Sequence, residues 1–464
     1  MTRFATLTLL LLLALPASAQ DALRVFVGNQ GGGGVSASVT SIAPGATEAD
    51  QLLEGQLGGF LQGMAVIGDR LYVTGNGTRV DVLDTATGQR VGQIEDATFT
   101  AARYIAEVSG NRAYITTQNY SPDATTSDVV IVDLATNAVT GRIAMPVTVM
   151  DIGFPAVFGN PEGLVVVDTP AGERAYISQA AFGQGDEIAV VDTATDTIVG
   201  TIATGCTARY PLAVGDAVLV PCANGTEMLA IDISVDPLAI AERVDAPDGL
   251  TLGTGFAQDA TVAPAIAVPT LTGGAAEVVY IIAPDTGIAV FDPSTSTFLD
   301  TISIPEADSR GIVALGVDPG RNTLYLGRPD PDNAFSAAGT VTVHAASGAL
   351  QATYDAGVYP SFVSVDLGST VTTEPLAEAG LRVSTPAPNP AVSRTTLTIE
   401  AERPAEATLA VFDALGREVS REQRALPAGS SEVSVDATVL PAGVYVVRIE
   451  TPEGAAMRRL TIAR

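Results

Sequence analysis

The feature that most constrains the fold of this chain is a short pattern of residues that recurs along most of its length. Each copy contains an apolar strand, a second apolar strand that ends in aspartate, and a third strand after a turn of the Asp-Thr-Ala-Thr-Gly type. The clearest copy runs from Leu71 through Asp84 to Ile94. The residues at the aspartate position are Asp84, Asp133, Asp192, Asp232, Asp292 and, in the last copy, His344. Intervals of about 40 to 60 residues without helical periodicity predict the blades of a β-propeller.

The ends of the repeated region indicate how the ring closes. A weaker copy of the pattern begins at Leu23, and no strand precedes it to serve as the innermost strand of its blade. Residues 359–366 follow the last copy and have the composition of the missing strand. Since a closed ring hides sheet edges that would otherwise pair with other chains, we expect this late segment to complete the first blade. The sequence therefore predicts an all-β fold, with a seven-bladed β-propeller over residues 20–366.

The first nineteen residues have the three parts of a secretory signal peptide. Arg3 precedes an apolar stretch from Leu7 to Leu15, and the small residues Ala17 and Ala19 follow it. This stretch is shorter than the roughly 20 residues that span a bilayer, so we expect cleavage before Gln20 and not a membrane anchor. No later segment has an apolar run of that length. We therefore expect no transmembrane segment in the mature chain.

The charge balance bears on the partners of the chain. Its formal net charge is −28 at pH 7, and ten arginines balance ten acids within residues 381–464, so the acidic excess lies in the propeller. A negative field repels phosphate backbones. We therefore expect no nucleic-acid partner, whereas a cationic or metal partner is compatible with the charge. A scattered acidic surface also serves solubility alone, and the sequence leaves that interpretation open.

The two cysteines, Cys206 and Cys222, lie on either side of a predicted hairpin. Residues 211–220 have the pattern of two strands joined at Gly215-Asp216, which would bring the two sulfurs to neighbouring strands. An exported chain meets oxidising conditions in which such a pair forms a bridge. We expect a structural disulfide, with two buried free thiols or a redox pair as the alternatives.

A second β pattern follows the propeller. Residues 367–387 are rich in Thr, Pro, Ala and Glu, a composition typical of a linker. Polar and apolar residues then alternate in five segments, as in half-buried strands. The segments are 395–399, 407–412, 432–435, 443–449 and 459–462. They predict a small immunoglobulin-like β-sandwich over residues 388–464.

The clearest repeat has a distinctive sequence of its own. Residues 72–76 read Tyr-Val-Thr-Gly-Asn, and Asp84 opens an Asp-Thr-x-Thr-Gly turn. In these residues, the region from 22 to 366 resembles the YVTN-type seven-bladed propellers of exported bacterial proteins. The resemblance implies the fold and leaves the ligand open, because one fold serves many functions.

Several motifs follow one another near the C-terminus, and a basic strand ends the chain at Arg464. The motif positions are Pro388, Asn389 and Pro390 at the entry, Gly416 in the middle, and Gly443 and Tyr445 near the end. In these residues the last 80 or so positions resemble the C-terminal sorting domain of type IX secretion substrates. The resemblance implies recognition by the type IX secretion machinery and export across the outer membrane, to the cell surface or the extracellular medium. It also implies that the domain is usually removed after export.

Side chains that carry common catalytic chemistry are scarce. The only histidine, His344, occupies the turn position that aspartate fills in the sister repeats, where a polar side chain caps the backbone. The repeated aspartates lie one to a blade, so they cannot converge as an acid/base pair. Gly31 to Gly34 lacks the Lys-Ser/Thr and the helix of a phosphate-binding loop. We identify no catalytic residue and no cofactor-binding residue.

Calcium is the one cofactor for which the sequence offers candidate ligands. Oxygen donors occur together on predicted loops at Asp330, Asp332 and Asn333, and again at Asp123 and Asp128. Neither group matches a full twelve-residue calcium loop, and the His and Cys clusters of transition-metal sites are missing. We therefore expect no cofactor other than calcium.

Two classes of function are compatible with these observations. The first is a secreted or cell-surface propeller that acts as a non-catalytic binding module through the loops of one face. The alternative is a propeller-fold hydrolase such as a lactonase, with a carboxylate or metal site at the central channel. The long segments 146–173 and 245–276 supply loops for either class. The scarcity of catalytic side chains favours the binding module.

Overall fold

The computed structural model describes residues 23–462 apart from a set of internal segments. The residues outside the description are 1–22, 58, 97–98, 100, 122, 152–154, 159, 180–184, 224, 235–236, 254–259, 265–276, 285, 300, 305–310, 368–380, 384–390, 392, 402, 414–417, 442, 452–453 and 463–464. The expected signal peptide therefore lies outside the described residues. Two compact units divide at about residue 369, the larger one covering residues 20–369. In the described part of the chain, no helix has both the length and the apolar character needed to cross a membrane.

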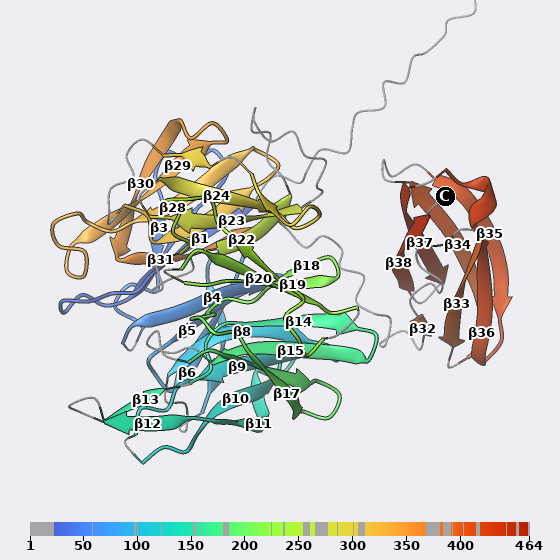
Figure 1. Ribbon diagram of the computed structural model, residues 1–464, viewed down its shortest axis with the longest axis horizontal. Coiled ribbons are helices and arrows are strands. Elements are labelled where there is room, and N and C mark those ends of the chain that lie inside the picture. The colour runs from blue at the N-terminus through green and yellow to red at the C-terminus, as the bar shows by residue number, and fades with distance from the viewer. Residues whose placement is uncertain are drawn as a thin grey trace, which may run out of the picture. The chain divides into compact units, whose positions relative to one another are not determined.

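Seven antiparallel sheets of four or five strands, here called blades 1 to 7, and one two-stranded hairpin make up the described β structure of the larger unit (Figure 1). Blade 1 contains β31 (Pro360–Asp366), β1 (Arg24–Asn29), β2 (Ser38–Ile42) and β3 (Asp50–Leu52), in that spatial order. Blade 2 contains β4 (Leu61–Ile67), β5 (Arg70–Gly75), β6 (Arg79–Asp84) and β7 (Arg90–Glu95). Blade 3 contains β8 (Ala102–Val108), β9 (Arg112–Thr117), β10 (Thr126–Asp133) and β11 (Ala138–Pro146). A separate hairpin follows, formed by β12 (Thr148–Asp151) and β13 (Pro155–Phe158).

The remaining blades repeat this order of strands. Blade 4 contains β14 (Leu164–Thr169), β15 (Gly172–Gln179), β16 (Glu187–Asp192) and β17 (Thr197–Ala203). Blade 5 contains β18 (Leu212–Val214), β19 (Ala217–Pro221), β20 (Glu227–Asp232) and β21 (Glu242–Asp245). Blade 6 contains β22 (Ala260–Pro264), β23 (Glu277–Ala283), β24 (Gly287–Asp292), β25 (Thr297–Phe298) and β26 (Ile302–Ser303). Blade 7 contains β27 (Ala314–Asp318), β28 (Thr323–Arg328), β29 (Ala338–Ala345) and β30 (Leu350–Val358).

The first strands of the blades form a closed ring. The first strand of each blade contacts the first strand of the next, and β27 of blade 7 contacts β31 of blade 1. The propeller strand that comes last in the sequence, β31, closes this ring by pairing antiparallel with β1. In this pairing, Arg24 lies opposite Asp366 and Phe26 lies opposite Ser364. The expectation that residues 359–366 complete the first blade is confirmed, as is the predicted propeller fold.

The repeated aspartates cap the turns that follow them. The Oδ1 atom of Asp84 accepts hydrogen bonds from the backbone N–H and the hydroxyl of Thr87, at 2.9 and 2.8 Å. The aspartates of four other blades accept backbone hydrogen bonds in the same way, namely Asp133, Asp192, Asp232 and Asp292. The hydrogen bonds from Thr87 lower the pKa of Asp84. The aspartate of the repeat is therefore a local structural residue.

The residue four positions after the capping residue adopts a left-handed backbone conformation. Glycine, which carries no Cβ penalty there, occupies the position in blades 2 and 7, as Gly88 and Gly348. Other blades place Asn137, Asp196 and Ser296 there, with φ between 52° and 55°. Asparagine and aspartate tolerate this region better than most side chains. The left-handed conformation thus explains why these turns end in small or polar residues, namely Gly, Asn, Asp or Ser.

Apolar side chains from neighbouring blades share one core. Between blades 2 and 3, Tyr72 and Ile94 pack in one cluster with Ile105 and Ile115, all of them buried. Similar clusters join other neighbouring blades, and each includes alternate residues of the central strands. Because each blade buries one face against the next, the repeats stabilise one another in series.

The C-terminal unit is a β-sandwich of two sheets, as the sequence predicts. One sheet contains β32 (Leu381–Val383), β33 (Arg394–Ala401) and β36 (Gly429–Asp436). The other contains β35 (Glu418–Leu426), β34 (Ala405–Asp413), β37 (Gly443–Thr451) and β38 (Gly454–Ile462), and a short helix, η2 (Ala437–Val439), follows β36. Both sheets contribute to a core that includes Leu397, Val433, Val447 and Leu460.

Two strands of the sandwich lie where the sequence analysis placed none. Strand β32 pairs with β33 and falls within residues 367–387, which were expected to be a linker, so the sandwich begins before residue 388. Strand β35 reads Glu-Val-Ser-Arg-Glu-Gln-Arg-Ala-Leu and is mostly exposed. It lies at the edge of its sheet, where pairing to one neighbour holds a strand that has no apolar face of its own.

The two ends of the propeller differ in how its strands are connected. Consecutive strands run antiparallel, so successive connections alternate between the two ends. One end, here called the turn face, carries short connections such as residues 68–69 between β4 and β5. The other end, here called the loop face, carries the connections between blades and those between the second and third strands of a blade. Its connections include the long segment between β11 and β14, which contains the hairpin β12–β13.

Candidate binding face

A cavity of about 450 Å³ opens at the loop face of blade 2. Its walls are the connection between β3 and β4, the facing ends of β5 and β6, and the loop that joins those two strands. Four of the lining residues are glycines, and the side chains that project polar or aromatic groups include Gln56, Phe60, Thr78, Arg79 and Asp81. The volume falls in the range of roughly 300 to 1,000 Å³ that is usual for small-molecule sites.

The aromatic residue of this cavity, Phe60, is exposed to 44% and yet has a fixed backbone. Its carbonyl oxygen accepts a hydrogen bond of 2.9 Å from the N–H of Asn76, and the following N–H, of Leu61, donates to the carbonyl of Gln30. Gly59 makes this close approach possible, because it has φ of +103° and an added Cβ would lie 2.8 Å from the Asn76 carbonyl oxygen. An apolar ring is thus held at the surface by hydrogen bonds from two neighbouring segments.

The charged residues of the cavity form a chain of contacts that begins at Arg79. Its guanidinium donates to the carbonyl of Gln56 and lies 3.5 Å from Asp81, whose side chain is only 2% exposed. The same carboxylate lies 2.8 Å from Arg90 and accepts a hydrogen bond of 2.9 Å from Gln93. Asp81 therefore orients the guanidinium of Arg79, which is the charged group that the cavity exposes.

Aromatic rings from three blades meet at the centre of the ring. The hydroxyl of Tyr104, on β8 of blade 3, donates to the hydroxyl of Tyr210, which precedes β18 of blade 5, at 2.5 Å. The ring centroids of these tyrosines are 5.4 Å apart, and Phe362 of blade 1 lies 6.2 Å from Tyr104. Blades 1, 3 and 5 are not neighbours in the propeller, so these side chains meet only across the propeller axis. Aromatic side chains therefore meet across the central channel at this level.

A buried carboxylate lies beside these rings between two guanidinium groups. Glu162 precedes β14 of blade 4, and two nitrogens of Arg103 contact it, the shortest at 2.9 Å. Arg209 approaches the other carboxylate oxygen to 3.4 Å, and Gln118 donates to that oxygen at 2.6 Å. The side chain of Glu162 is 2% exposed and those of Arg103 and Arg209 are 10% and 6% exposed. The group joins blades 3, 4 and 5 at the loop face.

The environment of Glu162 keeps it ionised. Burial opposes the charged form, but the two guanidiniums and the hydrogen bonds from Arg103 and Gln118 outweigh it, so the pKa of Glu162 lies below its usual value. Burial raises the pKa of Tyr104, and the neighbouring Tyr210 raises it further. At neutral pH the carboxylate therefore carries no proton to donate, and its oxygens are occupied by three side chains.

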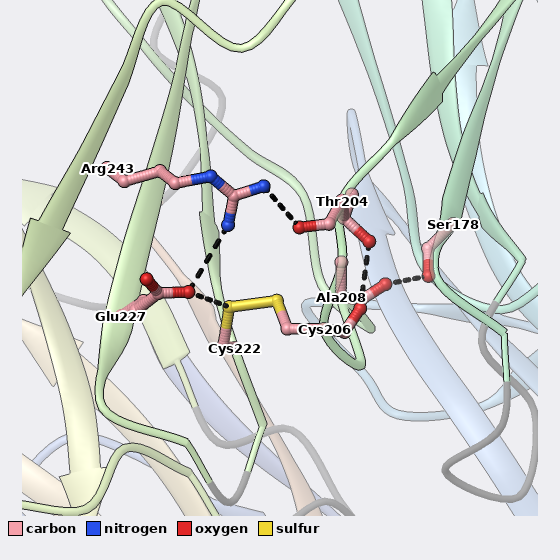
Figure 2. Close-up of a disulfide and its surroundings, with 7 residues drawn as sticks. All are labelled: Ser178, Thr204, Cys206, Ala208, Cys222, Glu227 and Arg243. Atoms are coloured by element: carbon pink, nitrogen blue, oxygen red, sulfur yellow. Dashed lines mark hydrogen bonds and ion pairs between the residues drawn. A yellow bond between two sulfur atoms is a disulfide. The ribbon is translucent and has the colours of Figure 1, made fainter.

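The expected pairing of the cysteines is present in the structure. Cys206 and Cys222 are joined with their Cα atoms 5.7 Å apart (Figure 2). Cys222 follows strand β19 of the expected hairpin, whereas Cys206 lies in the connection that leads from blade 4 into blade 5. Arg243 bridges the same region, donating to the carbonyl of Thr204 at 2.6 Å and lying 3.2 Å from Glu227 (Figure 2). The bridge thus ties an inter-blade loop to the blade that follows it.

The candidate calcium ligands belong to two separate blades. In blade 3 they are Asp123 and Asp128, and the carboxylate of Asp128 lies 3.0 Å from Arg142. In blade 7, the carboxylate of Asp330 accepts hydrogen bonds from the N–H groups of Asp332 and Asn333, at 3.1 and 2.7 Å. Among the described residues, no three acidic, histidine or cysteine side chains are grouped so as to hold a metal ion. Calcium binding by these residues thus remains a proposal.

His344 lies near the end of β29, just before the turn of blade 7 that corresponds to the capped turns elsewhere. Its Nδ1 atom is 2.9 Å from the carbonyl oxygen of Gly348, and the side chain is fully buried. A carbonyl accepts hydrogen bonds, so this nitrogen must carry the proton. The aspartates of the other turns accept from backbone N–H groups, whereas His344 donates to a carbonyl. The residue lies on the turn face, away from the cavity of blade 2.

The expected sorting residues fall partly outside the described chain. Pro388, Asn389, Pro390 and Gly416 lie among residues that the structure does not describe. Gly443 begins β37, where it pairs with Ile462, and Tyr445 is buried and donates from its hydroxyl to the carbonyl of Pro441 at 2.9 Å. The two described positions therefore support the strand that pairs with the last strand of the chain.

The residues that make the cavity and the buried ion cluster were not identified from the sequence. Strands β4 and β5 lie between Phe60 and β6, which carries Arg79 and Asp81. The members of the ion cluster, Arg103, Glu162 and Arg209, lie in three blades. One signal was available, because Asp81 and Glu162 are acids within or beside strands that are otherwise apolar. A buried acid of this kind requires a partner, but its identity depends on the register of distant segments.

Comparisons with known proteins agree with the division into two units. Residues 387–463 match the family of secretion system C-terminal sorting domains. No curated protein matches the sequence at a significant level. The sorting domain marks the chain for export by the type IX route, across the outer membrane to the cell surface or the extracellular space.

Solved structures resemble the propeller. A putative 6-phosphogluconolactonase from Bacteroides fragilis is 12% identical, with a TM-score of 0.50 over 75% of this chain and 99% of that chain. Kuenenia stuttgartiensis hydrazine synthase is 14% identical, with a TM-score of 0.44 over 66% of this chain and 90% of its own. A protein of unknown function from Bacteroides caccae is 13% identical, with a TM-score of 0.41 over 74% of this chain and 98% of its own. At these identities the first similarity shows the fold alone.

Proposed function

We propose that this chain is a non-catalytic binding module, delivered to the cell surface or the medium by the type IX route, that binds its ligand on the loop face of the propeller. The observation that carries the proposal is the cavity of blade 2, with an exposed aromatic ring whose backbone is fixed. Rigid aromatic side chains with polar neighbours are typical of binding surfaces, since little conformational entropy is lost when a ligand covers them.

The centre of the ring supports this proposal over the hydrolase alternative. A lactonase site at the central channel needs an accessible carboxylate or metal there. Among the described residues, the aromatic rings of Tyr104, Tyr210 and Phe362 meet at the central channel. The nearby carboxylate of Glu162 is held between two guanidiniums. A carboxylate with a lowered pKa and occupied oxygens is a poor general acid at neutral pH.

A screen for turnover tests the proposal. The purified chain is incubated with a panel of lactones and esters, and we expect no hydrolysis above the uncatalysed rate. Turnover that is present in the wild type and absent from the Glu162→Gln variant would establish the hydrolase alternative. Val91→Ala, an exposed position on the outer strand of blade 2, is the control for loss of folded protein.

A truncation tests the separate roles of the two units. The core of the sandwich contains only residues from 391 onward, and the described clusters of the propeller contain none of them. A chain that ends after Asp366 should therefore fold and resist proteases, but remain in the periplasm. Residues 381–464 fused to an exported reporter should carry it to the surface. Surface display of the truncated chain at the wild-type level would rule out the sorting role.

A further inference from the structure

The cavity of blade 2 has a shape and a set of side chains that fit one ligand class. We propose that it binds an uncharged oligosaccharide, an inference that rests on the binding function proposed above and names its ligand. The cavity holds about 450 Å³, lies at the loop face, and opens beside the exposed ring of Phe60.

Glycines make the walls of the cavity unusually open to a polar ligand. Gly55, Gly59, Gly75 and Gly77 all line it and place no side chain between the backbone and the space. Two of them are fixed by close packing, because a Cβ at Gly75 would lie 2.7 Å from the Phe60 carbonyl oxygen and one at Gly59 would lie 2.8 Å from that of Asn76. Such walls expose backbone N–H and C=O groups, which suit a ligand rich in hydroxyl groups.

The ring of Phe60 supplies a flat apolar surface without a polar atom. A pyranose ring carries several C–H groups on one face and its hydroxyls around the edge, so a flat aromatic ring can cover that face while the hydroxyls stay free. The backbone of Phe60 is fixed on both sides by hydrogen bonds to Asn76 and Gln30. A ligand that stacks on the ring therefore meets a backbone that is already in place, which reduces the entropy lost on binding.

Polar side chains surround this ring at the edge of the cavity. Gln56 and Thr78 are exposed, and their amide and hydroxyl groups both donate and accept hydrogen bonds, as sugar hydroxyls do. The guanidinium of Arg79 has 34% side-chain exposure and is oriented by the carbonyl of Gln56 and by Asp81. Its planar fork of donors can bind two neighbouring hydroxyl oxygens at once. Asp81 itself, at 2% exposure, acts as a positioning residue for Arg79.

The charges favour an uncharged ligand over an acidic one. Asp81 lies within 3.5 Å of Arg79 and 2.8 Å of Arg90, so one carboxylate offsets part of the charge of the two guanidiniums. The chain as a whole carries a net charge of −28, which repels polyanions such as uronic-acid polymers. Hydroxyl groups and C–H faces, without a carboxylate, match what the cavity presents.

The test uses the fact that the chain contains no tryptophan. The Phe60→Trp variant keeps an aromatic ring in the cavity and makes it the single tryptophan of the protein, so its emission reports what covers it. The probes are cello-, xylo- and malto-oligosaccharides from two to six units, oligogalacturonides of the same lengths, and a library of extended peptides. We expect a saturable change in emission with at least one neutral series, and calorimetric binding of the same series to the wild type.

Matched variants locate the binding. Phe60→Ala and Arg79→Gln should each weaken binding of that series about 10-fold or more, because each removes a group that touches the ligand. Val91→Ala and Arg70→Gln should change it less than about 2-fold. Val91 is an exposed apolar residue of the same blade, and Arg70 has the same 34% exposure as Arg79 and likewise pairs with an aspartate, but on the turn face. Circular dichroism and thermal unfolding of each variant establish that it is folded.

Each other outcome contradicts the assignment in a recognisable way. Tighter binding of oligogalacturonides than of every neutral series would overturn the uncharged ligand. Peptide binding that alters the tryptophan emission, without any sugar binding, would overturn the carbohydrate class and leave the binding module standing. No response to any probe, in both the tryptophan variant and wild-type calorimetry, would overturn the site, whereas hydrolysis of a lactone or an ester would overturn the proposed function itself.

Discussion

The turn face and the loop face of the propeller are each stabilised by contacts, but these contacts differ in the sequence separation of the residues that they join. On the turn face, the order comes from neighbours in sequence, as when Asp84 accepts hydrogen bonds from Thr87 three residues later. On the loop face, the contacts join residues that are far apart, such as Arg103 with Glu162 and Tyr104 with Tyr210. The repeat therefore maintains the turn face in blades 2 to 7, while the loop face differs from blade to blade.

This difference explains where a binding site can arise in such a fold. A turn that is closed by its own residues tolerates little change, because the capping side chain and the left-handed residue must both be kept. Loops that are fixed from outside by ion pairs or a disulfide are free to vary in sequence and length. The cavity of blade 2 lies on the loop face, which is consistent with this division.

The largest expected effect tests the long-range contacts of the loop face. Replacing Glu162 by Ala leaves two buried guanidiniums without their shared carboxylate, and breaking a buried ion pair in this way costs about 3–5 kcal/mol. Asp69→Ala is the matched control, since this carboxylate is 75% exposed and pairs with Arg70 on the turn face. We expect the control to change the free energy of unfolding by less than about 1 kcal/mol. Chemical denaturation measures both values, and equal losses would contradict the comparison.

The same residue should make the stability depend on pH in the acid range. The pKa of Glu162 is lowered in the folded protein, so the unfolded chain, with a pKa of about 4.3, takes up the proton first as the pH falls. Its contribution is fully present above that pH and is lost as the pH decreases through the folded pKa. The difference in unfolding free energy between wild type and Glu162→Gln should thus shrink below about pH 4. A constant difference from pH 7 to pH 3 would show that charge is not involved.

The second expected effect concerns the disulfide of the loop face. Cys206 and Cys222 are separated by 16 residues, and closing a loop of that length stabilises a protein by about 3 kcal/mol in the chain-entropy model. The double variant Cys206→Ser/Cys222→Ser should lose about that amount in thermal unfolding. Alkylation under denaturing, non-reducing conditions should find no thiol in the wild type, and two free thiols would end this account of the loop.

A smaller effect is expected from a capping residue of the turn face. Asp292 accepts hydrogen bonds from the N–H and the hydroxyl of Ser294, and its replacement by Ala should cost about 1 kcal/mol. Ligand binding should be unchanged, because this turn lies on the turn face of blade 6, away from the cavity of blade 2. Phe60→Ala should do the reverse, leaving the unfolding midpoint within about 1 °C and weakening binding. Loss of ligand binding in a fully folded Asp292→Ala variant would show that residues of the turn face also contribute to binding.

The smallest effect is expected from calcium. Asp330 already accepts two backbone hydrogen bonds and Asp128 pairs with Arg142, so a cation would have to displace these contacts. Adding millimolar calcium to the chelator-treated protein should raise the unfolding midpoint by less than about 1 °C. An increase of several degrees that disappears in Asp330→Asn would instead assign a calcium site to the loop face.

The features that could be predicted from the sequence are those that depend on local contacts, as on the turn face. The blades, the closing strand Pro360–Asp366 and the capped turns were all predicted, because the repeat encodes them within a few residues. The strand Glu418–Leu426 was missed, since an exposed edge strand shows no alternation of apolar residues. The group around Glu162 was missed for another reason, as its members are brought together only by the ring. Local patterns thus predict the scaffold, whereas the site depends on contacts across blades.

The measurement that tests the central claim most directly blocks one face at a time. Both cysteines are in the disulfide, so a single added cysteine can be labelled with a polyethylene glycol maleimide. Gln56→Cys places the label at the cavity on the loop face, and Gln89→Cys, also exposed, places it in the capped turn of the same blade. The probe is the tightest ligand among the neutral oligosaccharides, oligogalacturonides and peptides. We expect labelling at position 56 to weaken its binding about 10-fold or more and labelling at position 89 to leave it unchanged. Equal binding by both labelled proteins, or loss only at position 89, would contradict the assignment of binding to the loop face.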